Sequence, residues 1–173
     1  MKRGTNVDKF LLPLARCSCQ GYLTDELQVT DLLEWILREV GVSSVIQTTF
    51  SISEEYIRRL FFIREKGLVS NFDLLLDFKA TNKTINLWCF IDNVADNAYL
   101  VDNHSKVLLV HSASGRKIVV VTSQNLTRGN RNEATMIAEN ADIYDSMFDR
   151  IQDIIKTQSL PLKDVLNGTA STD

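Results

Sequence analysis

The sequence has little of several features that define common protein classes. It contains three cysteines, two prolines and two histidines in 173 residues. Cys17 and Cys19 are too close together for an easy bridge, and Cys89 stands alone, so we expect no disulfide framework and a reducing compartment. A Cys-x-Cys pair without a second cysteine pair or nearby histidines is also a poor zinc signal, so we expect no metal site.

Charge of one sign and long hydrophobic runs are missing as well. The chain carries 19 basic and 22 acidic residues, a formal net charge of −3. No global field would gather a polyanion, so a nucleic-acid site must come from a local group of bases. The apolar run from Phe10 to Ala15 is too short for a signal sequence, and no stretch approaches the roughly 18 apolar residues of a membrane helix. We expect a cytoplasmic protein that does not bind a membrane.

What is present suits one globular unit. The chain is 45% hydrophobic and long enough for a single core. We expect one domain over residues 1–160. We expect the remainder, 161–173, to be a disordered polar tail, because it ends in the small and polar run LNGTASTD.

Hydrophobic patterning predicts alternating helices and strands. Helical spacing covers 27–40, 54–66 and 142–158, with Gly41 and Gly67 as stop signals. Strand-like runs cover 43–52, 72–78, 84–91, 97–102, 106–110, 117–121 and 133–139. The central runs are continuously apolar, as in strands buried on both faces. We therefore predict an α/β fold with a mixed β-sheet flanked by helices on both faces.

Polar residues stand at the ends of two neighbouring strand-like runs. His104 and Lys106 lie two residues apart, so in an extended segment both leave the same face, about 7 Å apart. Ser123 and Asn125 have the same relation after the next run. If the two runs pair as a hairpin, an imidazole, an ammonium, a hydroxyl and an amide converge. That set suits a phosphoryl group, with donors for its oxygens and a nucleophile for phosphorus.

The segment HSKVLLVH…TSQN…E resembles the His-x-Lys signature of the phospholipase D superfamily. In that superfamily His-x-Lys, an Asp, Gly-Ser-x-Asn and a downstream Glu form each half of a phosphodiesterase site. The likeness covers about residues 40–155, because SSVIQTTFSISEEYIRRLFFIREKGLVSNFDLLLDF reads like the family's preceding strand, helix and strand. It implies a phospholipase D-like half-site domain.

The resemblance also implies roles for five residues. His104 would be the nucleophile in one subunit and the general acid in the other. Lys106 and Asn125 would hold the non-bridging phosphate oxygens, and Ser123 would line the site. Glu133 would hydrogen-bond to an imidazole and orient it. No cofactor is implied.

Two positions depart from the family pattern. The Asp position, five residues after the lysine, is His111, and the Gly before the serine is Thr122. Members of the superfamily that act on DNA or DNA adducts also lack that Asp. We expect His111 to be a solvent-facing residue at a strand end.

Basic residues lie on both sides of Ser123 and Asn125 in the sequence: Arg116, Lys117, Arg128 and Arg131. Their positions around the motif predict contacts with a nucleic-acid backbone. The alternative, left open by the sequence, is an ordinary solvated charged face.

Together these features predict a metal-independent phosphodiesterase, a nuclease that cleaves DNA through a phosphohistidine intermediate. The mechanism needs two imidazoles and the chain supplies one motif, so we expect a homodimer with both motifs at the two-fold axis. Two alternatives remain. One is an inactive nucleic-acid-binding module that keeps the phosphate pocket, and the other is a phosphodiesterase that acts on phospholipid.

Overall fold

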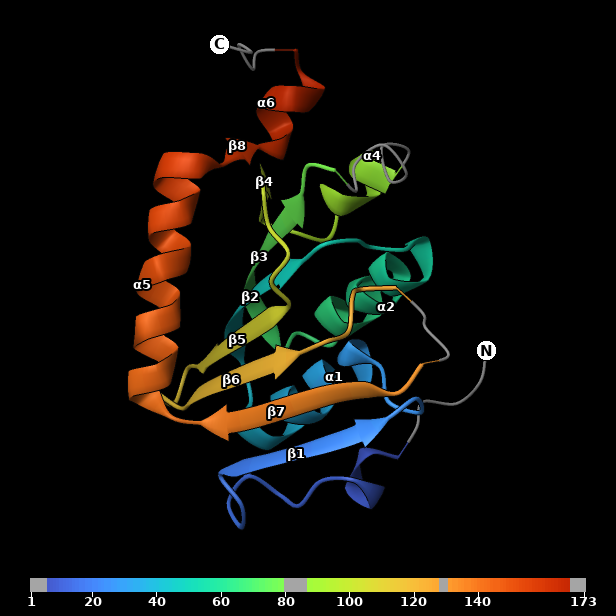
Figure 1. Ribbon diagram of the computed structural model, residues 1–173, viewed down its shortest axis with the longest axis vertical. Coiled ribbons are helices and arrows are strands. Elements are labelled where there is room, and N and C mark those ends of the chain that lie inside the picture. Colours follow the sequence, from blue (N-terminus) through green and yellow to red (C-terminus); the bar gives the residue numbers. More distant parts are fainter. Residues whose placement is uncertain (1–5, 80–86, 128–130, 169–173) are drawn as a thin grey trace.

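The computed structural model describes residues 6–79, 87–127 and 131–168. Eight strands form one mixed sheet in the order β1-β7-β6-β5-β2-β3-β4-β8 (Figure 1). The pairs β2–β3 and β3–β4 are parallel, and the other neighbours are antiparallel. The strands are β1 (Cys19–Thr24), β2 (Ser43–Thr49), β3 (Val69–Asp77), β4 (Asn97–Val101), β5 (Val107–Ser112), β6 (Lys117–Thr122), β7 (Glu133–Glu139) and β8 (Leu160–Pro161).

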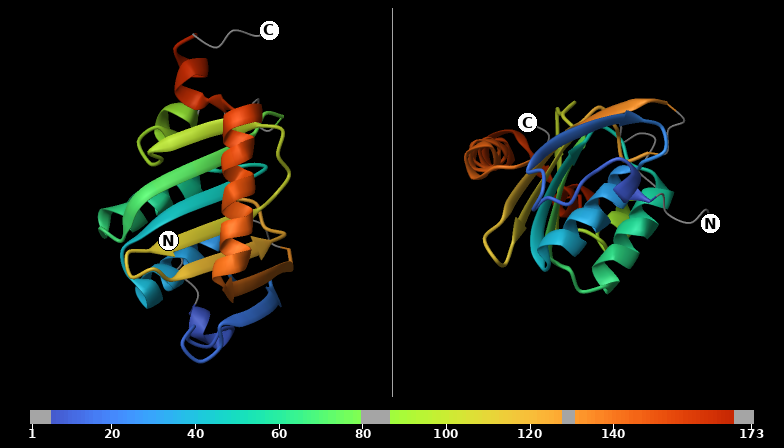
Figure 2. Two further views of the ribbon diagram at one scale, coloured as in Figure 1. Left: turned by 90° about the vertical axis from the view of Figure 1, so that its left-hand side faces the viewer. Right: turned by 90° about the horizontal axis from the view of Figure 1, so that it is seen from below.

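Helices cover both faces of this sheet, as the continuous apolar runs predict. Helices α1, α2 and α4 pack on one face and α5 packs on the other (Figure 2). Neighbouring residues of β2 show the two sides, since Val45 belongs to the first core and Ile46 to the second. The helices are a 3-10 turn (Val7–Lys9), α1 (Val29–Val40), α2 (Glu54–Glu65), α4 (Trp88–Ile91), α5 (Ala141–Gln158) and α6 (Leu162–Leu166).

Local signals set the ends of α1 and α2. At the start of α1 the Asp31 carboxylate accepts a hydrogen bond from the backbone N–H of Gln28 at 2.9 Å. Gly41 ends that helix with φ of +80°, a conformation that side chains with a Cβ disfavour. Ser53 caps α2 by accepting from the N–H of Tyr56 at 3.4 Å. The predicted helices at 27–40 and 54–66 are confirmed.

The strand predicted at 84–91 is wrong where the structure describes it. Residues 88–91 form the helix α4, with Trp88 buried against the core and Phe90 exposed. Residues 84–86 lie outside the described part of the chain. The physical reason is the topology: β3 and β4 are parallel neighbours, so their connection must cross over one face of the sheet, and it packs there instead of pairing.

The chain continues its fold past residue 160, where we expected a polar tail. Leu160 and Pro161 form the outermost strand β8, which pairs with β4, and Leu162 at the start of α6 is buried. The expectation of disorder is therefore wrong for 161–166, and residues 169–173 are not described. Within the described residues no helix has the length and apolar character needed to cross a membrane.

Candidate functional site

Six strands have an end on the same side of the sheet, and we call this row of strand ends the site edge. Parallel β2, β3 and β4 all end there, and their antiparallel partners begin or end beside them. Its members are Thr49 (β2 end), Asp77 (β3 end), Val101 (β4 end), Val107 (β5 start), Thr122 (β6 end) and Glu133 (β7 start).

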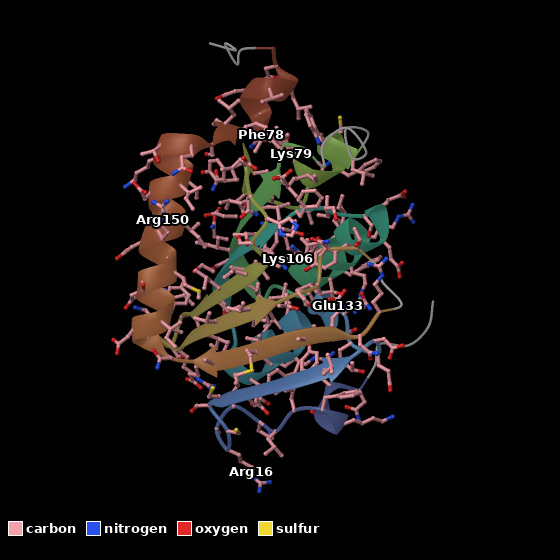
Figure 3. The ribbon with its side chains drawn as sticks, viewed as in Figure 1. Arg16, Phe78, Lys79, Lys106, Glu133 and Arg150 are labelled. Atoms are coloured by element: carbon pink, nitrogen blue, oxygen red, sulfur yellow. The ribbon has the colours of Figure 1, made fainter. Side chains whose placement is uncertain are left out.

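The five residues predicted to form the site are all at this edge. His104 and Lys106 immediately precede β5, Ser123 and Asn125 follow β6, and Glu133 begins β7. The hairpin continues past the strands, since the N–H of Thr122 donates to the carbonyl of Lys106 at 3.1 Å. Figure 3 shows Lys106 and Glu133 near each other at this edge. The segments that carry the five residues thus lie at the same end of the sheet.

Ser123 and Glu133 form a fixed pair. The Ser123 hydroxyl donates a short hydrogen bond to the Glu133 carboxylate and accepts one from the N–H of Ala134 at 3.1 Å. The backbone N–H of Ser123 donates to the carbonyl of Ala134 at 3.0 Å. Because its proton is committed to a carboxylate, this hydroxyl can accept, but not donate, toward the site.

Lys106 carries the cationic charge at the centre of the edge. Its ammonium donates to the carbonyl of His104 at 2.8 Å. Partial burial lowers the pKa of Lys106, and the nearby negative charge of Glu133 opposes that shift. An ammonium has three donors, so one carbonyl leaves it able to bind an anion.

Asn125 holds a buried polar atom that lacks a partner. Its side-chain Oδ1 is shielded from solvent and makes no hydrogen bond to any residue that the structure describes. A half-turn of the amide exchanges this oxygen with the nitrogen, so the same position can present N–H to a phosphate oxygen. A buried polar atom without a partner is costly, so a ligand or another chain that completed this hydrogen bond would lower the free energy.

The His104 side chain is exposed, and contacts of the adjacent residues hold its segment in place. The Ser105 hydroxyl lies 2.8 Å from the Thr48 hydroxyl, which also accepts from the N–H of Val107 at 2.9 Å. The imidazole packs against the Phe50 ring, with centroids 5.2 Å apart. No hydrogen bond to the imidazole is present among the described residues, so the predicted contact with Glu133 is not made within this chain.

Sequence reasoning missed several residues that position the site. Thr48 and Phe50, at the end of β2, hold the His104 segment and its ring. Asp77, which is 2% exposed, accepts from the backbone N–H of Lys79 at 2.7 Å and of Asn103 at 2.8 Å. An acidic residue at the end of an otherwise apolar strand is a usable signal for Asp77. Nothing in the sequence separates Phe50 from a core aromatic.

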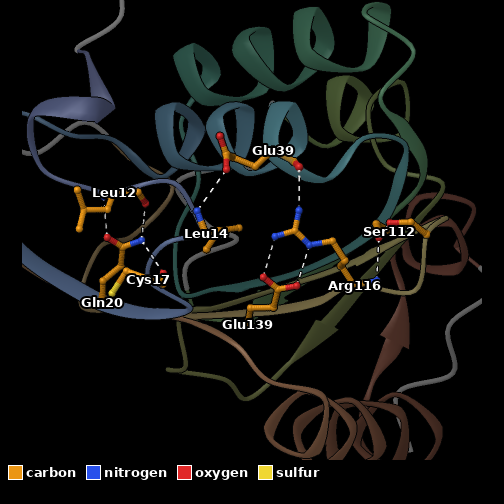
Figure 4. Close-up of polar contacts among 9 residues, drawn as sticks. Leu12, Leu14, Cys17, Gln20, Glu39, Ser112, Arg116 and Glu139 are labelled. Carbon is orange, nitrogen blue, oxygen red and sulfur yellow. Dashed lines mark hydrogen bonds and ion pairs between the residues drawn. The ribbon is translucent and has the colours of Figure 1, made fainter.

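Two of the predicted phosphate contacts are in the wrong place. Arg116 and Lys117 lie at the turn between β5 and β6, the opposite end of the hairpin from Lys106. Arg116 makes two 2.7 Å contacts with the Glu139 carboxylate and one of 2.9 Å with the carbonyl of Glu39 (Figure 4). The Arg116 guanidinium holds the pKa of the Glu139 carboxyl below its usual range.

Of the other predicted contacts, Lys117 lies at the hairpin turn and Arg131 lies at the site edge. Lys117 contacts Asp145 at 2.5 Å and lies 5.6 Å from the centroid of the Tyr144 ring on α5. Arg131 is exposed, two residues before Glu133, at the site edge. Arg128 lies outside the described residues. Arg131 therefore keeps its place as a predicted substrate contact, and the contact predicted for Arg128 stays a prediction.

His111, in the position of the family's Asp, lies at the opposite end of the β5–β6 hairpin from Lys106. It pairs with Lys117 across the hairpin, and its half-buried ring lies 5.8 Å from that of Tyr144, under α5. The expectation of a solvent-facing residue is wrong because α5 crosses this end of the strands. A departure from the pattern here does not alter the site edge.

The cysteines and carboxylates form no evident centre of their own. All three cysteines are free, and the Cys17 thiol donates to the carbonyl of Cys19 at 3.1 Å. Across residues 6–79, 87–127 and 131–168, no three His, Cys, Asp or Glu side chains are grouped so as to hold a metal ion.

No protein-family model and no curated protein matches the chain. Among solved structures, it is similar to Nuc, a phospholipase D family member from Salmonella typhimurium. The TM-score is 0.64 at 17% identity, covering 83% of this chain and 97% of Nuc. The chain has the fold of the phospholipase D superfamily.

Two longer proteins share the phospholipase D fold over part of their length. Phosphatidylserine synthase from Haemophilus influenzae Rd KW20 has a TM-score of 0.54 at 14% identity, over 84% of this chain and 39% of the synthase. The archaeal chromatin protein TrmBL2 has a TM-score of 0.52 at 9% identity, over 82% of this chain and 53% of TrmBL2. At these identities the likeness establishes the fold, and the activity must be argued from the site edge.

Proposed function

We propose that this protein is a metal-independent phosphodiesterase that cleaves DNA through a phosphohistidine intermediate in a homodimeric active site. The observation that carries the proposal is the meeting of Lys106, Asn125 and the Ser123–Glu133 pair beside an exposed imidazole. An ammonium and an amide N–H can bind the non-bridging oxygens, and the imidazole of His104 can reach phosphorus.

The first chemical step forms a phosphorus–nitrogen bond. The neutral imidazole of His104 attacks phosphorus, and the bond to the leaving oxygen breaks with its electron pair going to that oxygen. The leaving oxygen takes a proton from the imidazolium of the partner subunit's His104. Lys106 and Asn125 stabilise the negative charge on the phosphoryl oxygens as it redistributes.

The second step returns the enzyme to its starting state. Water attacks phosphorus and gives a proton to the imidazole of the partner's His104, while the phosphorus–nitrogen bond breaks. One imidazole cannot attack and protonate on opposite sides of phosphorus, so the single motif requires two chains. In this proposal Glu133, which accepts a hydrogen bond from Ser123 in the single chain, orients an imidazole in the assembled site.

A binding module without turnover is the second candidate. Within the described residues no carboxylate holds the imidazole of His104, and TrmBL2, described as a chromatin protein with a novel mode of DNA binding, has the same fold. In this reading Lys106 and Asn125 hold a phosphate that is never attacked.

Cleavage assays in EDTA separate the two candidates. We expect the wild-type protein to cleave DNA without divalent ions and the His104→Ala protein to bind DNA without cleaving it. Quenching with end-labelled DNA should trap an acid-labile label on the wild-type protein. His111→Ala is the matched control, since that imidazole lies under α5. Binding without cleavage or trapped label would establish the binding module, and cleavage that requires Mg²⁺ would exclude the metal-independent mechanism.

Mixing experiments test the shared site. When wild-type and His104→Ala chains exchange subunits in equal amounts, mixed dimers have one imidazole and should be inactive. Activity should then fall to about one quarter rather than about one half, because only wild-type pairs turn over. A linear dependence on the wild-type fraction, or a fully active monomer in sedimentation, contradicts the homodimeric site.

A further inference from the structure

A buried carboxylate ties a second exposed segment to the candidate nucleophile. The two oxygens of Asp77 accept from the backbone N–H groups of Lys79 and Asn103. The N–H of Phe78 also donates to the carbonyl of Val101 at 3.1 Å. The turn after β3 is therefore fixed beside the segment that carries His104.

This turn presents an aromatic ring and an ammonium group. Phe78 is 37% exposed, and the side chain of Lys79 is 74% exposed. The Lys79 ammonium lies 3.4 Å from the carboxylate of Asp102, itself 81% exposed. An exposed pair at that distance contributes little, so the ammonium is able to exchange this carboxylate for another anion.

The turn lies at a useful distance from the phosphate-binding groups. Strand β3 is separated from β5 by β2 alone, so the two ends are about 10 Å apart along the site edge. Figure 3 shows Phe78 and Lys79 on one side of Lys106 and Glu133 on the other, while Arg16 and Arg150 lie away from the edge.

We propose that Phe78 and Lys79 form a subsite for the nucleotide that flanks the cleaved phosphodiester, and that the substrate is single-stranded nucleic acid. The inference rests on the proposed phosphodiesterase site and adds its substrate class. The Phe78 ring stacks on an unpaired base, and the Lys79 ammonium contacts the adjacent phosphate.

The chemistry of the subsite separates the substrate classes. An aromatic face that stacks on a base needs that base unpaired, which a duplex does not provide without local melting. A second cation near the first suits a polymer with successive phosphates. A phospholipid has one phosphodiester and acyl chains, which the Lys79–Asp102 pair does not suit.

The test compares substrates with and without flanking nucleotides. The probes are bis(4-nitrophenyl) phosphate and a single-stranded oligothymidylate of about 12 nucleotides, within the length one such site covers. For Lys79→Ala and Phe78→Leu, we expect the loss of kcat/KM on the oligonucleotide to exceed the loss on the small diester by about tenfold. Phe78→Trp should restore the stacking. The urea midpoints of Phe78→Trp and Phe78→Leu show whether each variant is folded.

Arg16→Ala and Arg150→Ala are matched controls, because they remove an exposed cation away from the site edge. A binding arm uses the His104→Ala protein and fluorescence anisotropy of the labelled oligonucleotide. In that background Lys79→Ala should reduce the slope of log K against log salt by about 0.7, and the controls should not.

The outcomes distinguish the two proposals. If the wild-type protein cleaves neither probe, the phosphodiesterase proposal fails, and the binding arm alone decides the subsite. The subsite is overturned if Lys79→Ala and Phe78→Leu affect both probes equally and leave the salt slope unchanged. Preference for the matching duplex, or hydrolysis of phosphatidylcholine vesicles as fast as the oligonucleotide, also overturns it.

Discussion

The two ends of the β5–β6 hairpin carry similar residues, but these residues have different polar partners. At the turn, Arg116 and Lys117 each contact a carboxylate, and His111 packs beside Tyr144. At the site edge, among the residues that the structure describes, the Lys106 ammonium donates to one carbonyl and the buried oxygen of Asn125 has no hydrogen-bond partner. Both ends have an imidazole and a lysine, so residue type alone does not mark a site.

The difference lies in how completely the polar groups are satisfied by the chain itself. Groups that meet their partners on folding stabilise the native state, as the Arg116–Glu139 pair does. Groups left short of partners cost free energy unless something outside the chain completes them. This difference supports the proposal that a ligand binds at the site edge, whereas the ion pairs at the turn stabilise the fold. Removing a group from one end and a similar group from the other tests this contrast.

The two histidines should give the largest contrast. We expect His104→Ala to reduce kcat at least about 1,000-fold, because loss of a nucleophile removes the covalent step. His111→Ala should leave kcat within about twofold, since its ring lies under α5. Single-turnover rates on end-labelled DNA measure both. Equal losses in the two variants would mean that the site is not at the strand-end edge.

The two lysines should differ by less. Lys106→Ala should lower kcat/KM by about 100-fold, the usual effect of removing one donor to the reacting oxygens, and should weaken DNA binding too. Lys117→Ala removes a cation that contacts Asp145 and Tyr144, so DNA affinity at a fixed salt concentration should stay within about twofold. If Lys117→Ala weakens DNA binding as much as Lys106→Ala, the turn also contacts substrate.

At the hairpin turn, a substitution should instead lower the stability of the fold. Arg116→Ala leaves the half-buried Glu139 carboxylate without its guanidinium and should lower the free energy of unfolding by about 1–3 kcal/mol at neutral pH. Because Arg116 lowers the pKa of Glu139, this contribution is complete above the unfolded-state pKa of about 4.3 and is lost as the pH falls through the folded-state value. Urea midpoints of the two proteins should therefore converge near pH 3. A constant difference across that range contradicts an ionic origin.

Asn125→Ala should separate stability from activity. Removing a buried oxygen that has no partner among the described residues should raise the free energy of unfolding by up to about 1 kcal/mol, whereas turnover should fall with the loss of a phosphate donor. Urea unfolding and DNA cleavage of the same preparation test both effects. A clear loss of stability would show that the amide is satisfied within the folded chain.

Much of this layout was predictable from the sequence because it follows local rules. Two-residue spacing at the ends of paired strands was sufficient to expect His104, Lys106, Ser123 and Asn125 together. The error over Arg116 and Lys117 has a geometric origin. Six-residue strands carry the turn roughly 17 Å from the motif, so nearness in sequence did not mean nearness in space.

Other features depended on contacts that no local pattern contains. The apolar run around Trp88 is equally compatible with a short buried strand and a short buried helix, and the parallel pairing of β3 with β4 decides for the helix. Asp77 accepts from the backbone N–H of Asn103, 26 residues away, and Phe50 meets His104 across more than 50 positions. Such long-range partners require the sheet order.

The smallest expected effect is a proton taken up on binding. Burial lowers the pKa of Lys106, so at a given alkaline pH a larger fraction of this side chain is neutral than of an ordinary lysine. A bound phosphodiester places a negative charge beside it and raises the pKa again, so binding should draw a proton from the buffer. The uptake should be a fraction of a proton and should grow as the pH rises toward the pKa of Lys106. Titration calorimetry of oligonucleotide into the His104→Ala protein, in two buffers of different ionisation enthalpy, measures it. In the His104→Ala background Lys106→Arg keeps a charge at every accessible pH and should abolish the uptake, whereas an uptake that persists in this variant would assign the proton to another group.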